Sequence, residues 1–99
     1  MRPIHVARLD KARPVLVLTR EIVRPHMNTV TVAPITTTIR GLSTEVPVGA
    51  TNGLNEQGVV ACDHITTIPA GALASQIGRL LDEQEATLTE AIHAAFDLA

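Results

Sequence analysis

The stretch ARPVLVLTREIV, residues 12–23, decides the fold because it places a run of branched apolar residues directly after an Arg-Pro step. A continuous apolar run without alternating polar residues is typical of a strand that is covered on both faces. We therefore predict a buried strand over residues 15–19. Pro14 restricts the residue before it to extended backbone, so we expect Arg13 to leave the sheet at a fixed angle just before this strand.

Other short strands are predicted on both sides of this run, each bounded by turn signals. They cover residues 4–8, 28–37, 44–48, 58–62 and 76–80, with 65–68 as an extension or a kink. Pro34 and Pro47 fall inside two of these strands, and proline donates no ladder hydrogen bond. We therefore expect an edge or a bulge at Pro34 and an edge at Pro47. The close spacing of the strands favours a small barrel over an open sheet.

The last third of the chain changes to a helical period. After a helical turn over residues 70–74, an amphipathic helix is predicted over residues 83–97, with Asp82 and Glu85 as a capping box. Its apolar face, which we expect to pack on the barrel, is formed by Leu88, Ala91, Ile92, Ala95 and Phe96. The predicted class is α+β, mainly β.

Length and composition predict one domain over residues 1–99 with one hydrophobic core. No apolar run approaches the about 18 residues that cross a bilayer, and the first residues lack the order of a secretory signal. Cys62 is the single cysteine, which excludes an internal disulfide, and we expect it in the core. These features predict a cytoplasmic protein that does not bind membranes.

Charge is distributed unevenly, although the formal net charge is only −2. Residues 1–40 carry seven Lys and Arg against two acids, whereas residues 41–99 carry Arg79 against eight acids. The basic half suggests an anionic partner, because Arg binds phosphate with two donors. On charge alone we favour the alternative that the acidic helix neutralises the basic strands within or between subunits.

Several classes of site are absent from the sequence. There is no Gly-rich phosphate loop, nucleophile elbow, HExxH or CxxC, and the four histidines are too scattered to predict a metal site. With one Phe and neither Tyr nor Trp, base stacking on aromatic side chains is excluded as the main mode of nucleic-acid binding. Recognition of a single strand then depends on guanidinium groups, hydroxyls and backbone, and no cofactor is predicted.

Three blocks of sequence hold the remaining candidates, which are Arg13, the threonine run 36–38 and Asp63. The blocks are RPVLVLTRE (13–21), VTVAPITTTIRGLSTEV (30–46) and GVVACDHITTI (58–68). In this order and at this spacing they resemble the MazF/PemK (Kid) toxins. The resemblance implies an SH3-like barrel of the CcdB/PemK type, usually a homodimer, that acts as a metal-independent, sequence-selective endoribonuclease on single-stranded RNA. It also implies a MazE-like antitoxin as partner.

The same match places the family's paired catalytic arginine and threonine at Arg13 and Thr36, and the catalytic carboxylate of one branch at Asp63. That branch has an arginine where this chain has Ala61, and the family's longer loop before the Arg-Pro step is shortened here. The threonine run has a simpler explanation as well, because threonine is common on exposed strands.

Cleavage of RNA without a metal ion requires deprotonation of the 2′-hydroxyl, stabilisation of the phosphorane and reprotonation of the 5′-oxygen. The planar guanidinium of Arg13 suits the stabilisation, whereas its pKa above about 12 makes it a poor base. Thr36 would add a hydrogen bond to the phosphate. Asp63, a neighbouring histidine and water all stay open as the base.

Base recognition is assigned to polar side chains around the same residues. They are Thr37, Thr38, Arg40, Asn55 and Gln57, and Arg20 either holds a flanking phosphate or pairs with Glu21. For Asn52 and Asn55, turn formation in the loop 52–58 is an equal alternative. Among other functions, a CcdB-like toxin that inhibits a topoisomerase without cutting RNA is retained, and a peptide-binding SH3 module is disfavoured by the lack of aromatic residues.

Overall fold

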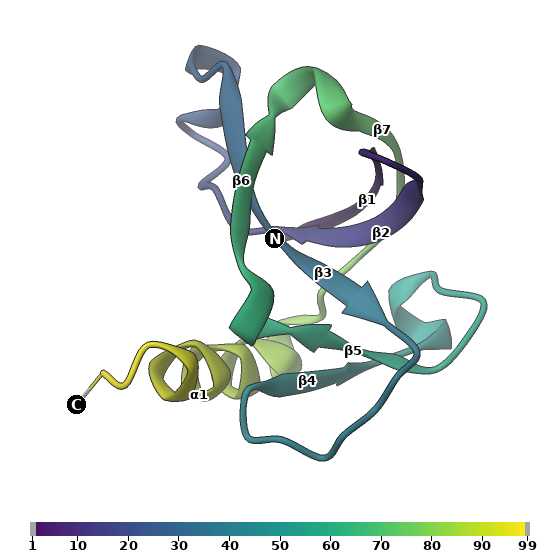
Figure 1. The fold of residues 1–99 in the computed structure, drawn as a ribbon, viewed down its shortest axis with the longest axis vertical. Helices are drawn as coiled ribbons and strands as arrows, with labels where there is room; N and C mark the ends of the chain where they lie inside the picture. Colours follow the sequence, from purple (N-terminus) through teal and green to yellow (C-terminus); the bar gives the residue numbers. More distant parts are fainter. Residues whose placement is uncertain (1, 99) are drawn as a thin grey trace.

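The computed structural model describes residues 2–98 and has the predicted mainly β architecture with one C-terminal helix (Figure 1). The elements are β1 (Pro3–Arg8), β2 (Ala12–Val17), β3 (Thr29–Thr36), β4 (Glu45–Val48), β5 (Gly58–Ala61), β6 (Thr66–Pro69), β7 (Leu73–Arg79) and α1 (Glu85–Ala95). Single 3₁₀ turns lie between them: η1 (Arg24–His26), η2 (Ala50–Asn52), η3 (Cys62–His64), η4 (Ala70–Ala72) and η5 (Asp82–Gln84).

The strands pair in the order β4-β5-β3-β2-β1-β7, and β6 pairs with β3. β3 shares its length between two partners, β6 along Thr29–Val32 and β5 at Ile35 and Thr36. The sheet divides at that point, with β4, β5 and α1 on one side in Figure 1 and the other strands curling around the opposite side. Among residues 2–98 no ladder joins β4 to β7, so the expected barrel is not closed by hydrogen bonds.

The apolar run of β2 is buried on both faces of the sheet, as predicted. Val15 and Val17 belong to a buried cluster with residues of β1, β3 and β6, whereas Leu16 belongs to a second cluster that includes β4, β5 and Leu88 of α1. Successive side chains of a strand point to opposite faces, so one run serves both clusters. The expectation of a single core was therefore wrong.

β2 begins three residues earlier than predicted, at Ala12, and Arg13 lies inside the strand rather than before it. The extension arises from the hairpin with β1, in which Ala7 pairs with Arg13 and Arg8 with Ala12. Backbone pairing in a hairpin leaves no continuous apolar run in the sequence, which explains the error.

Pro34 lies where β3 exchanges β6 for β5. Val32 is the last residue paired with β6, Ile35 is the first paired with β5, and Pro34 itself pairs only with Val15 of β2. A change of partner, rather than the predicted edge or bulge, leaves the proline unpaired on one side. Proline tolerates this place because it has no N–H to satisfy.

Pro47 lies in β4, which is at the end of the sheet as predicted. Its carbonyl accepts a hydrogen bond from Gln84 Nε2 at 3.3 Å, outside the ladder with β5. The same Gln84 accepts from the Leu81 N–H at 2.9 Å and from Asn52 Nδ2 at 2.6 Å. Gln84 thus ties the edge of the sheet to the chain that enters α1.

α1 packs on the second cluster through Leu88 and Ala91, which are buried, with Ile92 and Ala95 beside them. Phe96 was predicted on the same face but is 56% exposed, because the helix ends at Ala95. The predicted capping box of Asp82 and Glu85 is also wrong, since Gln84 bonds the Leu81 N–H instead. No helix among residues 2–98 is long and apolar enough to cross a membrane.

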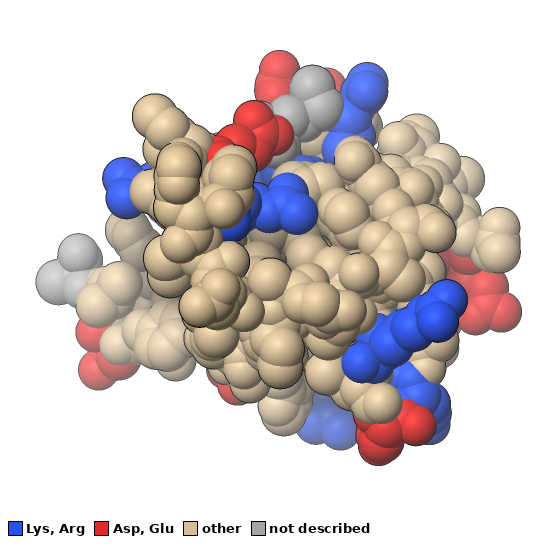
Figure 2. Space-filling model, turned by 90° about the horizontal axis from the view of Figure 1, so that it is seen from above, with Lys and Arg blue, Asp and Glu red and all other residues tan. Residues whose placement is uncertain are grey.

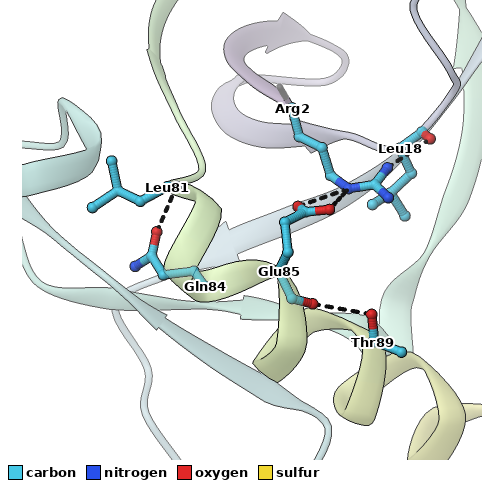
Figure 3. A network of polar contacts seen from close by, with 6 residues as sticks. All are labelled: Arg2, Leu18, Leu81, Gln84, Glu85 and Thr89. Carbon is cyan, nitrogen blue, oxygen red and sulfur yellow. Dashed lines mark hydrogen bonds and ion pairs between the residues drawn. The ribbon is translucent and has the colours of Figure 1, made fainter.

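Glu85 instead pairs with Arg2, whose Nε lies 3.1 and 3.0 Å from its two carboxylate oxygens (Figure 3). Arg2 also donates to the Leu18 carbonyl at 3.2 Å, so the N-terminal strand, β2 and α1 are joined at one point. This is the one ion pair recorded within residues 2–98. Neutralisation by the acidic helix within the chain therefore involves a single basic residue.

The face seen in Figure 2 carries its Lys and Arg side chains in separate groups with wide uncharged surface between them. The excess of basic residues in the first 40 positions therefore does not form one continuous patch on that face.

Candidate active site

The start of β2, the end of β3 and the loops that follow β3 and η2 line a groove of about 1350 Å³. Seven of the nine predicted site residues line it: Arg13, Thr36, Thr37, Thr38, Arg40, Asn55 and Asp63. Segments far apart in the sequence thus meet in one cleft. Arg13 and Thr36 both line this groove, and their catalytic roles stay a prediction.

Arg13 of β2 and Thr36 of β3 line the same groove, beyond the point where these two strands pair. The last ladder pair of these strands is Val15 with Pro34, and continuing the register by two residues places Arg13 opposite Thr36. Directly opposite residues point to the same face of an antiparallel pair, so both side chains lie on one side. Arg13 is exposed and forms no ion pair within the described chain, which leaves its guanidinium available to an anion.

Thr36 also fixes the backbone that follows it. Its Oγ1 accepts a hydrogen bond from the Thr38 N–H at 3.1 Å, a turn in which a hydroxyl replaces a backbone acceptor. The hydroxyl proton stays free to donate to another group. Thr37 and Thr38 are exposed on the wall of the groove.

Asp63 lies in η3, on the same groove, and its Oδ2 accepts the Thr44 hydroxyl at 2.6 Å. No hydrogen bond to its other oxygen is recorded among residues 2–98. His64, next in the chain, lines the groove as well. Burial and the neighbouring Asp63 carboxylate raise the pKa of the Cys62 thiol to about 11, which fits the predicted core position of this cysteine.

The loop between β3 and β4 is held by a carboxylate that the sequence analysis did not select. Glu45 Oε1 accepts the backbone N–H groups of Arg40, Gly41 and Leu42 at 3.1, 2.9 and 3.2 Å. The side chains of Arg40 and Leu42 line the groove. The only sequence signal for this arrangement is an acid four residues after a glycine, which is too common to be informative.

The opposite wall is the loop after η2, and here the two asparagines differ. Asn52 is 1% exposed, accepts the Gly49 N–H at 3.1 Å and donates to the Arg79 carbonyl at 3.0 Å, so it has the turn-forming role. Asn55 is exposed and lines the groove. The loop rests on β7 where Gly53 and Gly78 cross at backbone distance.

Two predicted residues lie away from the groove. Arg20 follows the far end of β2, where its carbonyl accepts the Val23 and Arg24 N–H groups, and Gln57 is exposed but does not line the cleft. His5 lines a separate hollow of about 480 Å³ and its Nδ1 is 2.9 Å from the Ala74 carbonyl oxygen. His5 therefore does not reach Arg13's groove.

The sequence analysis missed the other side chains that line the groove. Charged ones are Lys11, Glu45 and Glu56, and apolar ones include Leu42, Leu54 and Ile77. Lys11 lies in the turn before β2, where no strand period relates it to Arg13. The apolar residues come from three separate segments, and no local pattern connects them.

Residues 4–96 match the family model of the PemK-like, MazF-like toxins of type II toxin-antitoxin systems. Endoribonuclease MazF3 of Mycobacterium tuberculosis is 68% identical over 98 residues, which cover 99% of this chain and 95% of that protein. The solved structure of Mycobacterium tuberculosis toxin MazF-mt6 is 67% identical, with a TM-score of 0.96 and 99% of each chain covered.

A more distant structure supports the fold alone. It is an endoribonuclease in complex with its cognate antitoxin from mycobacterial species, 24% identical, with a TM-score of 0.88 over 98% of this chain and 93% of the other. The match to the family model covers all three sequence blocks and every residue of the groove. This chain belongs to the PemK-like, MazF-like toxins of type II toxin-antitoxin systems.

Proposed function

We propose that this toxin is an endoribonuclease that cleaves single-stranded RNA in the groove between β2, β3 and their loops, without a metal ion. The observation that carries the proposal is Arg13, a guanidinium without an ion-pair partner in residues 2–98, opposite Thr36 in a cleft open to solvent. Family membership favours this function over that of a CcdB-like topoisomerase inhibitor.

Cleavage begins when the 2′-hydroxyl oxygen, after losing its proton, attacks the adjacent phosphorus. A bond forms between these atoms, the bond from phosphorus to the 5′-oxygen breaks, and this oxygen takes a proton from water, leaving a cyclic phosphate and a 5′-hydroxyl. Arg13 binds two phosphate oxygens with its planar fork and stabilises the charge of the phosphorane. Thr36 donates a hydrogen bond from its hydroxyl group to the same phosphate.

We assign the base to Asp63, because Thr44 holds one carboxylate oxygen and the other faces no recorded partner within residues 2–98. Replacing Asp63 with Asn keeps the Thr44 contact and removes the proton acceptor, so kcat is expected to fall while KM changes little. His64→Asn is the matched comparison, because His64 is the neighbouring histidine of the groove. A larger loss of kcat in His64→Asn would transfer the role to that residue.

Base selection in this proposal uses Thr37, Thr38, Arg40 and Asn55 on the walls of the groove. Their hydroxyl, guanidinium and amide groups suit the edges of unstacked bases, the usual targets of sequence-specific RNA recognition. Arg20 and Gln57 lie outside the groove, so their contribution would be to flanking nucleotides of a longer RNA.

The experiment is incubation of the purified protein with mixed-sequence single-stranded RNA in EDTA. Discrete cuts are expected, and Arg13→Ala and Thr36→Ala should each lower kcat by about 10² to 10³, the usual cost of losing one preorganised donor. Arg79→Ala is the control, because Arg79 is exposed and lies outside the groove. RNA left intact by the wild-type protein in EDTA would overturn the proposal.

We also propose a MazE-like antitoxin as the neutralising partner, a homodimer as the active form and the cytoplasm as the compartment. Family membership supports the antitoxin, and the sequence resemblance to that family supports the homodimer and the compartment. Light scattering at micromolar concentration should give twice the 10.5 kDa mass of the chain. A mass of one chain would remove the dimer from the proposal.

A further inference from the structure

We propose that Glu45 is a positioning residue for substrate binding, which fixes the wall of the groove that carries Arg40 and Leu42. The inference rests on the proposed ribonuclease function and deepens it. Glu45 is not expected to touch RNA through its carboxylate, because that group is occupied by backbone amides. It acts on the substrate through the loop.

The geometry is that of an anion-binding nest closed by a side chain of the same protein. Three successive N–H groups, from Arg40, Gly41 and Leu42, point at one carboxylate oxygen at 3.1, 2.9 and 3.2 Å. Gly41 has φ +73°, the left-handed conformation that lets successive amides converge. The Glu45 N–H bonds back to the Leu42 carbonyl at 3.1 Å and closes the turn.

Few other contacts hold this part of the chain. Within residues 39–43, every backbone amide for which a hydrogen bond is recorded donates to Glu45. The anchors on either side are the Thr38 N–H on Thr36 Oγ1 and the Cys62 N–H on the Thr44 carbonyl. Without the carboxylate, the segment with Arg40 and Leu42 would keep only these two anchors and the backbone bond from the Glu45 N–H to the Leu42 carbonyl.

Removal of the Glu45 carboxylate should change the affinity for RNA in opposite directions, depending on whether the group acts by charge or by fixing the loop. If the carboxylate acted on RNA only by repulsion, its removal would strengthen binding of an anionic substrate. If the carboxylate acts by fixing the loop, its removal weakens RNA binding, because binding must then also supply the free energy that orders Arg40. Glu56 supplies the comparison, since it lines the same groove, is exposed and makes no recorded hydrogen bond within residues 2–98.

The test compares kcat and KM for RNA cleavage in Glu45→Ala, Glu45→Gln, Glu56→Ala and Gly41→Ala. Glu45→Ala should raise KM about tenfold with kcat changed less than about twofold, since it removes charge-assisted hydrogen bonds. Glu45→Gln keeps the Oε1 acceptor and should fall between Ala and the wild type. Gly41→Ala breaks the nest without changing charge and should raise KM, whereas Glu56→Ala should lower it.

Amide hydrogen exchange supplies a readout that does not depend on cleavage. Arg40, Gly41 and Leu42 should exchange about tenfold faster in Glu45→Ala than in the wild type, and their rates in Glu56→Ala should be unchanged. The inference alone is overturned if the wild type cuts RNA while Glu45→Ala lowers KM as Glu56→Ala does, or if the three amides keep their protection. A wild type that leaves RNA intact overturns the proposed function and this inference together.

Discussion

Thr36 shows how one side chain in this groove serves both the fold and the proposed chemistry. Its oxygen accepts the Thr38 amide at 3.1 Å, while its proton is free to point into the groove. An alanine at this position removes both functions at once. Serine keeps both functions and valine keeps only the side-chain volume, so this pair separates the effect of the hydroxyl from that of side-chain size.

Thr36→Ser keeps the hydroxyl, and we expect it to retain activity within a few fold of the wild type. Thr36→Val has nearly the same volume but no hydroxyl, and should lose about 10² to 10³ in kcat. Single-turnover cleavage of RNA, with thermal unfolding as a check on folding, measures the difference. Equal activities of the Ser and Val variants would contradict a role for the hydroxyl.

Cys62 leads to a prediction on stability. Its pKa is raised from 9.0 to about 11 by burial and by the Asp63 carboxylate. Above pH 9 the unfolded thiol ionises while the folded one keeps its proton, so the unfolded state binds fewer protons and stability falls as pH rises. We expect this loss between about pH 9 and 11 and none from this group below pH 9.

The measurement is the free energy of unfolding against pH for the wild type and for Cys62→Ala. The alanine variant should lack the part of the decline that belongs to the thiol. Parallel curves for the two proteins from pH 8 to 11 would show that Cys62 does not titrate differently in the folded state.

At the residue scale, the sequence was informative where one residue type is physically restricted. Arg13 was found because Pro14 restricts its backbone just before a buried strand, and Thr36 was paired with it through the family resemblance. Glu45 was missed because its importance comes from three amides that converge only after the loop folds. Lone acids at strand starts carry no signal of that kind.

At the scale of elements, the loop after η2 is seated on β7 by glycines. A Cβ on Gly78 would lie 1.7 Å from the Asn52 carbonyl oxygen, and one on Gly53 would lie 2.2 Å from the Ile77 carbonyl oxygen. Gly53 also has φ +87°, which disfavours other residues. This crossing positions Asn55 on the groove.

Gly78→Ala should therefore destabilise the protein by at least about 1–3 kcal/mol, the usual cost of overpacking, because η2 and β7 must separate. Gly71→Ala is the matched control, since a Cβ there meets nothing within 4 Å and its φ is not positive. Chemical denaturation measures both variants. Equal stability of the two would contradict the close crossing.

Strands and the helix were predictable wherever apolar residues recur with a strand or helix period. The residues at which these elements begin and end were not. β2 and β7 both start earlier than predicted, because their first residues are paired with β1. The start of α1 was also predicted wrongly. Gln84, not Glu85, accepts the hydrogen bond from a backbone N–H before the helix, and the Glu85 carboxylate pairs with Arg2.

At the scale of the whole molecule, the two buried clusters share β1, β2 and β3. Ile4, Leu16 and Ala33 belong to one, whereas Ala7, Val15 and Val32 belong to the other. Neither cluster can lose these strands without exposing the other. We therefore infer that residues 1–99 unfold as one domain.

Leu88→Ala in one cluster and Ile68→Ala in the other should each lower stability by about 2–5 kcal/mol. Calorimetry should show one transition in the wild type and in both variants, with equal calorimetric and van't Hoff enthalpies. Two transitions, with each variant shifting only one of them, would mean that the clusters fold independently.

The division of the sheet could not be read from the sequence. Closely spaced strands indicated closure into a barrel, whereas β3 changes partner near Pro34 and the sheet divides. The groove opens along that end of β3, where β2 and β3 no longer pair. Local patterns identify strands and reactive residues, but the gap between strands depends on pairings that no single segment encodes.

Pro47 limits the pairing of the edge strand β4 with a strand of another copy of the chain. In an antiparallel strand the N–H and C=O of one residue point the same way, and the Pro47 carbonyl is bonded to Gln84 away from β5. A foreign strand aligned along β4 would thus find no donor at this residue and an acceptor already taken. Accumulated copies of the toxin are protected at this edge from growing end to end into fibrils.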